Sequence, residues 1–316
     1  MTQDVQVCVL TYKRPLLLRA TLHSLLQQTL LASSRFRMHV LVVDNDPKQS
    51  GRAAFDSVMG GGGVAARYVG EPARGLAIAR NRALEESAAM DFMAFIDDDE
   101  VADPRWLQRL LKVQEEFDAD VVTGPVEPCY SSPPAWLVRG GFFARRSAAT
   151  GPMHGCVATN NVLLRGDVAR RSRFDPRFNA TGGEDTNFFQ TLAKQGARIA
   201  WADDAVVFED VPAERMKLRW LLRRASSDAG RFTRSCMVLE SGWRTRLLRA
   251  AKAVGGLLTG ALMLPLGILG AHYSVRGLQL IWRAAGTLKA LQGHAEGYYG
   301  ESQPAQLAGV PAAGEP

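Results

Sequence analysis

Three adjacent aspartates, Asp97, Asp98 and Asp99, follow directly after the apolar run Phe92–Ile96. Three carboxylates in a row repel one another unless a cation or hydrogen-bond donors compensate their charge. The hard ions Mg²⁺ and Mn²⁺ prefer oxygen ligands, commonly one or two carboxylates together with substrate phosphates. Because side chains alternate along an extended chain, Asp97 and Asp99 point the same way and are the expected metal ligands. Taken alone, the triplet also fits a solvated acidic turn.

A second acidic pair, Glu184 and Asp185, follows two glycines and opens the helix-like stretch Glu184–Gln195. A carboxylate at a helix N-terminus ionises readily, because the helix dipole and the free N–H groups favour its charge. Such a group can take the proton of an attacking hydroxyl, which is the work of a general base. A plain helix cap is the alternative interpretation of this pair.

Further polar side chains lie at strand ends or on the helix that follows. They are Thr11, Tyr12, Arg14, Asp44, Arg74 and Arg80. An aromatic ring can stack on a nucleobase, a carboxylate can accept a base N–H, and guanidinium groups bind a pyrophosphate. Each residue also has an ordinary structural interpretation, but agreement among several strand ends favours a nucleotide site.

The elements that must position these residues alternate between strands and helices. Predicted strands cover Val5–Leu10, Met38–Val43, Ala66–Val69, Phe92–Ile96, Asp120–Gly124, Arg198–Trp201 and Ala205–Phe208, and Cys156–Leu164 is expected to be ordered. Predicted helices cover Pro15–Gln28, Arg74–Ala89, Pro104–Phe117 and Glu184–Gln195. This alternation predicts an α/β fold, a mostly parallel sheet flanked by helices. Ligands of such sheets bind beyond the carboxyl ends of the strands, where the polar residues stand.

Five segments in this order resemble the family 2 glycosyltransferases. They are Val-Leu-Thr-Tyr-Lys-Arg-Pro, Val-Val-Asp-Asn, Gly-Leu-Ala-Ile-Ala-Arg-Asn, Phe-Ile-Asp-Asp-Asp and Gly-Gly-Glu-Asp-Thr. Within the family the chain is most similar to bacterial exopolysaccharide enzymes of the succinoglycan-type glucosyltransferase group, over about residues 5–234. The resemblance implies a GT-A (Rossmann-like) fold, a nucleotide-diphospho-sugar donor such as a UDP-sugar, Mg²⁺ or Mn²⁺, and transfer of a hexose with inversion.

Roles carry over by position. The resemblance assigns Thr11, Tyr12 and Asp44 to the nucleobase, Arg74 or Arg80 to the base or phosphates, Asp98 to the ribose and Asp97 with Asp99 to the metal. Asp185 resembles the catalytic base, with Glu184 as its neighbour.

Two departures from the family pattern matter. Many relatives place a further metal-ligating histidine where this chain has Glu209, and processive synthases carry Gln-x-x-Arg-Trp where it has Met216. The second departure argues against a polymerase that extrudes its product.

The chain of 316 residues has a net charge of +6, and the positive charge is concentrated. Arg215–Lys252 holds eleven Lys/Arg and two acids, which predicts a phosphate-bearing partner such as anionic lipid or a lipid-pyrophosphate acceptor. Nucleic acid is the least favoured partner, because stacking aromatics are sparse there and no nucleic-acid-binding motif occurs. Ala253–Ala271 carries no charge over nineteen residues. A transmembrane helix, a re-entrant or interfacial hairpin and a buried helix all remain open for it.

We therefore predict a glycosyltransferase domain over residues 1–234, with a nucleotide-binding half (1–124) and an acceptor half (125–234). A basic and apolar membrane-associating region (235–298) and a disordered tail (299–316) follow. Pro125–Pro152, irregular and with exposed aromatics, predicts a binding loop or lid, or a disordered surface loop. The four dispersed cysteines predict free thiols, and the expected location is the cytoplasmic face of the inner membrane. The alternatives are a sugar nucleotidyltransferase and a non-catalytic, membrane-associated sugar-nucleotide-binding protein.

Overall fold

The computed structural model describes residues 2–143, 148–155, 157–179 and 181–294. The predicted tail and Cys156, the first residue of the stretch expected to be ordered, lie outside these ranges. The strands are β1 Gln3–Thr11, β2 Phe36–Asp44, β3 Ala65–Gly70, β4 Phe92–Asp97, β5 Glu100–Ala102, β6 Val121–Thr123, β7 Val126–Cys129, β8 Gly151–Pro152, β9 Asn161–Arg165, β10 Ile199–Trp201 and β11 Val207–Asp210. The helices are α1 Pro15–Leu26, η1 Thr29–Ala32, α2 Arg52–Met59, α3 Leu76–Glu86, α4 Trp106–Phe117, α5 Ala135–Gly140, α6 Gly166–Arg171, η2 Pro176–Phe178, α7 Glu184–Lys194, α8 Leu218–Leu239, α9 Trp243–Met263, η3 Leu264–Ile268 and α10 Ala271–Leu291.

The large sheet is buried on both faces, which explains why its central strands are apolar at consecutive positions. In β1, Val7 and Val9 belong to the core under α1, α2 and α4, whereas Cys8 belongs to the core under α3, α6 and α7. The strand order is β3-β2-β1-β4-β9-β6-β10-β8. β9 and the edge strand β8 run antiparallel to their neighbours, and the other pairs are parallel. The predicted fold class is confirmed.

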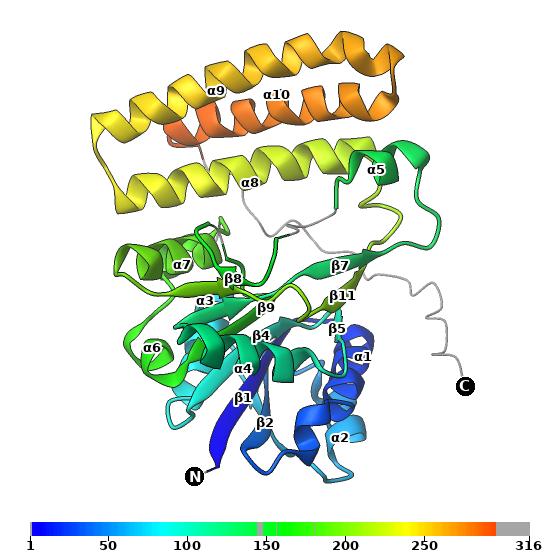
Figure 1. The fold of residues 1–316 in the computed structure, drawn as a ribbon, viewed down its shortest axis with the longest axis vertical. Helices are drawn as coiled ribbons and strands as arrows, with labels where there is room; N and C mark the ends of the chain where they lie inside the picture. Colours follow the sequence, from blue (N-terminus) through cyan, green and yellow to red (C-terminus); the bar gives the residue numbers. More distant parts are fainter. Residues whose placement is uncertain (1, 144–147, 156, 180, 295–316) are drawn as a thin grey trace.

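The strand register brings the predicted site residues to one edge. Thr11 pairs with Asp44 across β1 and β2, and Leu10 pairs with Asp97 across β1 and β4. Beyond this edge, β5, β11 and β7 form a small second sheet, in which Glu209 pairs with Glu100. The carboxyl ends of the strands and the small sheet therefore surround the same place (Figure 1).

The predicted irregular stretch Pro125–Pro152 contains β7, α5 and β8. The prediction that its aromatic side chains are exposed is wrong. They are partly buried against other rings. The ring of Trp136 lies 5.6 Å from that of Phe142, and Phe143 stacks at 5.8 Å on Trp220. Sequence patterns could not show this packing, because Trp220 comes from a distant helix. The described cysteines Cys8, Cys129 and Cys236 are free thiols, as predicted.

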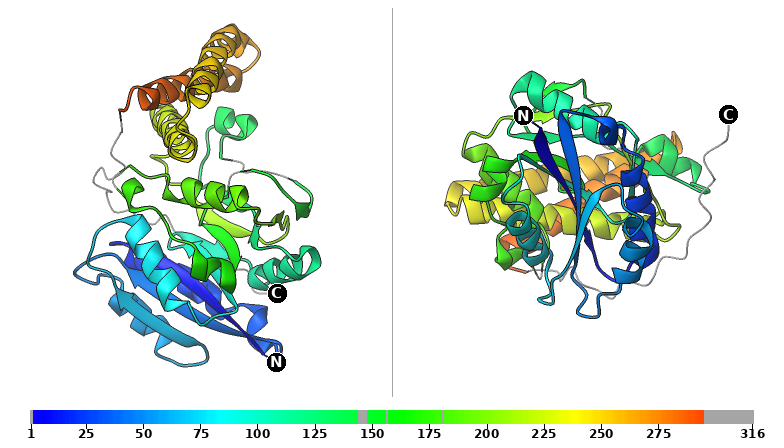
Figure 2. Two further views of the ribbon diagram at one scale, coloured as in Figure 1. Left: turned by 90° about the vertical axis from the view of Figure 1, so that its left-hand side faces the viewer. Right: turned by 90° about the horizontal axis from the view of Figure 1, so that it is seen from below.

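The last three helices form a separate layer at the end of the molecule opposite the N-terminus (Figures 1 and 2). α8 contacts α7 of the sheet domain, and α10 packs against α8, α9 and α5. The boundary predicted near residue 234 falls inside α8. Trp243–Ile268 is the one helix within the described ranges that is long and apolar enough to cross a membrane, with a mean hydropathy of 1.5. Only 11% of its most apolar window is buried, so it is no core helix.

Candidate active site

Asp44, the last residue of β2, is fully buried at the sheet edge. One carboxylate oxygen accepts the N–H of Asp46 at 2.9 Å, and the other accepts the N–H of Gly51 at 2.8 Å and the hydroxyl of Tyr68. Burial, together with the Asp44 carboxylate, raises the pKa of Tyr68, so its hydroxyl stays a donor. The residue assigned to the nucleobase therefore also holds the loop between β2 and α2.

The turn after β1 places cations near an aromatic ring. Lys13 has a left-handed backbone, with φ at 56°, which lets the chain turn sharply between β1 and α1. The Lys13 ammonium lies 5.0 Å and the Arg74 guanidinium 5.5 Å from the centroid of the Tyr12 ring. The predicted base-stacking residue thus stands among positive charges suited to a nucleotide.

Asp98 is buried between β1 and α1, with 5% of its surface exposed. Its carboxylate accepts the hydroxyl of Thr11 at 2.7 Å and Nη1 of Arg14 at 3.3 Å. Burial and the neighbouring Asp99 raise the pKa of Asp98 to about 7, although Arg14 and Thr11 oppose the shift. The carboxyl assigned to the ribose is therefore held inside the protein.

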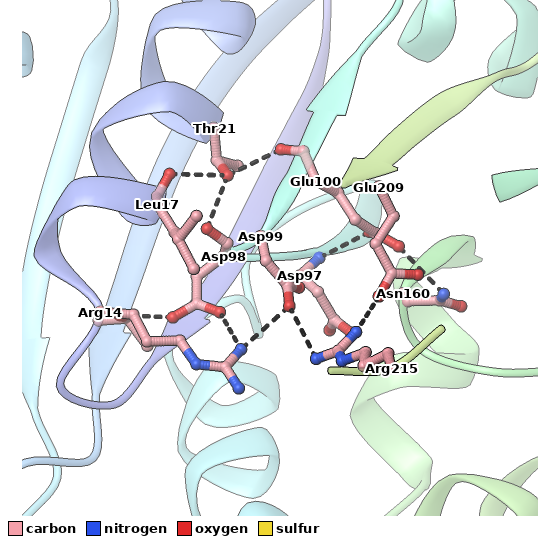
Figure 3. A network of polar contacts seen from close by, with 11 residues as sticks. Arg14, Leu17, Thr21, Asp97, Asp98, Asp99, Glu100, Asn160, Glu209 and Arg215 are labelled. Atoms are coloured by element: carbon pink, nitrogen blue, oxygen red, sulfur yellow. Dashed lines mark hydrogen bonds and ion pairs between the residues drawn. The ribbon is translucent and has the colours of Figure 1, made fainter. Parts of the chain in front are cut away.

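Glu100, directly after the triplet, is a further buried acid that the sequence did not lead us to predict. Its carboxylate accepts the N–H of Asp97 and the side-chain amide of Asn160, each at 3.0 Å. Burial and the charges of Asp97 and Asp99 raise its pKa well above the usual value. The turn thus concentrates negative potential that a cation would offset (Figure 3).

Arg215, in the segment between β11 and α8, also belongs to this site, although it was not predicted there. Its guanidinium donates to Glu209 at 2.6 Å and pairs with Asp99 at 3.7 Å (Figure 3). Asp99 pairs as well with Arg14 at 3.1 Å. The available signal was the basic segment that begins at Arg215, which we assigned as a whole to a phosphate-bearing partner such as anionic lipid or a lipid-pyrophosphate acceptor.

Asp97 and Asp99 are suitable oxygen ligands for a divalent cation. No cluster of three or more His, Cys, Asp or Glu side chains arranged for a metal occurs in the part of the chain that the structure describes. Two carboxylates completed by substrate phosphates match the preference of Mg²⁺ and Mn²⁺ for a few protein ligands. The charge at the turn and the chemistry of the pair therefore fit a metal that binds together with a diphosphate.

Two glycines position the acids at the start of α7. Gly182 and Gly183 have φ values of 70° and 94°, which side chains rarely adopt, and Gly183 packs against Arg231. The next residue, Glu184, turns inward and is 3% exposed, whereas Asp185 is half-buried. One oxygen of Asp185 accepts the N–H of Thr186 at 2.6 Å.

Arg80 interacts electrostatically with the acids at the start of α7 and with Asp97 of the aspartate triplet. It is 7% exposed and forms a buried ion pair with Glu184, whose second oxygen has no hydrogen-bond partner within the described ranges. Burial opposes the Arg80 charge, but Glu184, Asp185 and Asp97 raise its pKa above the usual value. Arg80 is thus paired with Glu184 inside the protein, and the charges of Asp97 and Asp185 add to the stabilisation of its guanidinium.

Comparisons with known proteins agree with this geometry. The family model for glycosyl transferase family 2 matches residues 6–171, and the model for glycosyl transferase family group 2 matches residues 92–290. The succinoglycan biosynthesis protein ExoM of Rhizobium meliloti (strain 1021) is 37% identical over 230 residues, which cover 70% of this chain and 71% of that protein.

Solved structures share the fold at lower identity. The mannosyltransferase PcManGT from Pyrobaculum calidifontis, in complex with GDP-Man and Mn²⁺, has a TM-score of 0.62 and 19% identity, covering 91% of this chain and 88% of that one. TarS residues 1–349 from S. aureus, in complex with UDP, has a TM-score of 0.52 and 16% identity, covering 93% and 92%. Similarity at this level shows a common fold.

Proposed function

Because the chain belongs to glycosyl transferase family 2, we propose that it transfers one hexose per encounter from a nucleotide-diphospho-sugar to a saccharide acceptor in bacterial exopolysaccharide synthesis. One observation carries the proposal. Arg80 forms a buried ion pair with Glu184, which stands next to Asp185 in the first turn of α7, and the charges of Asp97 at the end of β4 and of Asp185 both raise the pKa of Arg80. An acid for the donor side and an acid for the acceptor side therefore share one site.

The donor half of the site is proposed to hold a UDP-sugar. Tyr12 stacks on the base, Thr11 and Asp44 order the surrounding loops, and Asp98 lies toward the ribose. Arg14 and Arg74 supply positive charge for the diphosphate, which suits the fork geometry of guanidinium groups. The complexes of TarS with UDP and of PcManGT with GDP-Man make a nucleotide donor plausible for this fold.

Asp97 and Asp99 would hold Mg²⁺ or Mn²⁺ together with the donor phosphates. A divalent ion bound there supplies charge stabilisation for the departing nucleoside diphosphate. In this proposal, guanidinium groups of the chain also stabilise the negative charge of the departing nucleoside diphosphate. Arg14 and Arg215 both form ion pairs with Asp99, so we expect their guanidinium groups to lie beside a diphosphate bound at this carboxylate.

Asp185 is proposed as the base of an inverting transfer. It takes the acceptor hydroxyl proton while that oxygen forms its bond to the anomeric carbon, and the bond to the diphosphate oxygen breaks on the opposite face. Asp185 lies in the first turn of α7, where backbone N–H groups are free to hydrogen-bond a carboxylate. Glu184 positions α7 through Arg80.

The proposed acceptor is a saccharide on a lipid pyrophosphate, reached at the cytoplasmic face of the inner membrane. The basic segment Arg215–Lys252 and the apolar helix Trp243–Ile268 support this location. We propose a division into a transferase domain (1–234) and a membrane-associating region (235–298).

The proposal is tested by a thermal-shift screen of nucleotide sugars with and without Mn²⁺ or Mg²⁺. One class of nucleoside diphosphate sugars should raise the melting temperature, and only when the metal is present. The selected donor is then assayed for metal-dependent hydrolysis. A protein stabilised by none of the donors, and hydrolysing none, would contradict the function.

A further inference from the structure

The outermost helix of the molecule exposes apolar side chains where a soluble protein would carry polar ones. In α9 only Ala253 and Gly260 are buried. We define the outer apolar face by six exposed residues of α9, η3 and the turn that follows: Val254, Leu258, Leu262, Leu266, Ile268 and Leu269. Leu262 is 77% exposed and Ile268 is 92% exposed. A contiguous apolar surface of this kind marks contact with a partner or a membrane.

The opposite side of the hairpin is occupied by the protein itself. A Cβ at Gly260 would lie 2.6 Å from the carbonyl oxygen of Gly277, and one at Gly286 would lie 2.0 Å from that of Ser226. These glycines therefore let α10 approach α9 on one side and α8 on the other. Arg276 of α10 also donates to the carbonyl of Gly140 at 2.5 Å, which joins the hairpin to α5. Within residues 2–294, apart from the short undescribed gaps, the outer side of the hairpin is left uncovered for a partner.

The charge of this region identifies the partner as an anionic lipid surface. Residues 241–294 contain seven Lys/Arg and no Asp or Glu. Arg244, Arg246 and Lys252 are exposed on the first half of α9 beside the exposed apolar residues Trp243, Leu247 and Leu248, and the outer apolar face follows from Val254 onward. Basic side chains beside an exposed apolar face are typical of helices that lie in a membrane interface. A second copy of the chain would bring like charges together with no acids to compensate them.

We propose that the outer apolar face lies in the plane of an anionic bilayer, at the boundary between headgroups and acyl chains, and that Trp243–Ile268 does not cross it. α10 packs along α8, which carries five arginines, among them the exposed Arg219, Arg223 and Arg224. A membrane-spanning hairpin would draw these charges into the hydrocarbon, which is strongly unfavourable. The inference names the partner surface of the transferase proposed above, but binding to lipid requires no transfer reaction.

Vesicle co-flotation of the full chain tests the surface. Vesicles of phosphatidylcholine with phosphatidylglycerol should bind the protein, and pure phosphatidylcholine should bind it more weakly. The double variant Leu258→Glu/Leu262→Glu should bind the anionic vesicles at least about ten-fold more weakly. Leu31→Glu, at an exposed leucine of η1 in the sheet domain, is the matched control and should bind normally. Unchanged melting temperatures confirm that both variants fold.

Dithionite quenching distinguishes a helix in the membrane plane from a spanning one. Single accessible cysteines replace Arg244 or Ile268, at the two ends of the apolar segment, in a chain with Cys129, Cys156 and Cys236 changed to serine and only the buried Cys8 kept. Each is labelled with nitrobenzoxadiazole and bound to vesicles. Externally added dithionite should quench both labels, because both lie in the outer leaflet. Protection of either label would show a spanning helix and overturn the proposal.

Two other results would also overturn the inference. Unchanged vesicle binding by the double variant would exclude the outer apolar face as the contact. Absence of vesicle binding, with a concentration-dependent dimer that the double variant abolishes, would show a second copy as the partner. Failure of the proposed function is a different result, in which the protein binds vesicles normally but hydrolyses no nucleotide sugar.

Discussion

The sheet edge and the helical layer depart from the usual distribution of side chains in opposite ways. At the sheet edge, charged groups such as Asp98, Glu100 and Arg80 are buried. In the helical layer, apolar groups such as Leu262 and Ile268 are exposed. Buried charges are unfavourable unless partners inside or outside the chain compensate them, and exposed apolar groups are unfavourable in water unless a partner covers them. The sheet edge suits a cation and a diphosphate, and the helical layer suits lipid, so the two regions predict different partners.

The largest effect should come from Asp99→Ala, because this change removes one of two carboxylates that would bind the metal. Donor hydrolysis and transfer should fall about 1,000-fold or more, as expected for loss of several kcal/mol of charge stabilisation. The steady-state rate with Mn²⁺ is the measurement, and EDTA should reproduce the loss in the wild type. Leu262→Glu, in the other region, and the exposed Asp56→Ala should both retain hydrolysis. Full activity of Asp99→Ala would refute the metal site.

Asp185→Asn should reduce turnover by about 100- to 10,000-fold, the usual contribution of a general base. Donor affinity should stay nearly unchanged, because only the proton acceptor is lost. Calorimetric titration of the donor and single-turnover rates separate the two quantities. Asp175→Asn, at the start of η2, is the control for a helix-capping aspartate. Collapse of donor affinity in Asp185→Asn would remove this residue from the base role.

Breaking the buried ion pair between Arg80 and Glu184 should mainly lower the free energy of unfolding. Arg80→Met leaves Glu184 charged and buried, which typically costs about 3–5 kcal/mol of unfolding free energy. Urea unfolding followed by circular dichroism measures the loss. Arg35→Met breaks the exposed pair with Glu115 and should change stability little. Equal losses in the two variants would show that burial does not distinguish these ion pairs.

Arg215→Gln should raise the donor KM about ten-fold, because it removes one charged contact near the diphosphate. The melting temperature and vesicle binding should stay close to the wild type. Lys217→Gln, an exposed residue two positions further along the same segment, is the control. An unchanged KM would return Arg215 to the basic surface to which the sequence pattern assigned it.

The last predicted effect is a pH dependence of stability without metal. The pKa of Asp98 is about 7 in the folded protein, against an ordinary value near 4. The folded state therefore holds this proton more tightly, and its contribution to stability is lost as pH rises from about 4 to about 7. The slope for one group is at most about 1.4 kcal/mol per pH unit. Asp98→Asn should flatten it in urea titrations, and a slope unaffected by that change would contradict the assignment.

The fold and the place of the site were predictable from local patterns. Apolar strands followed by polar residues, as at Asp44 and Asp97, predict both a parallel sheet and its functional edge. The contribution of Glu100 was not predictable, because its burial depends on β5 pairing with β11 far along the chain. Arg215 was likewise hidden in a basic run whose members have different neighbours in space.

The helical layer shows the same limit of sequence patterns. By composition, the uncharged segment Ala253–Ala271 left open a spanning helix, a re-entrant or interfacial hairpin and a buried helix, with membrane contact favoured over burial. The structure excludes the buried helix, because α9 has only two buried residues, Ala253 and Gly260. Close contacts such as that of Gly260 with Gly277 determine which side of α9 packs against α10. A local sequence pattern does not reveal such contacts, because the two residues are far apart in the chain.

The most direct test of the account is the linkage between metal and nucleotide binding. Calorimetry of the donor's nucleoside diphosphate, with and without Mn²⁺, compares the wild type with Asp99→Ala and Asp185→Asn. We expect Mn²⁺ to tighten binding in the wild type and in Asp185→Asn, but not in Asp99→Ala. Mn²⁺-enhanced binding that survives in Asp99→Ala would contradict the central claim that the sheet-edge carboxylates hold the cation on the diphosphate.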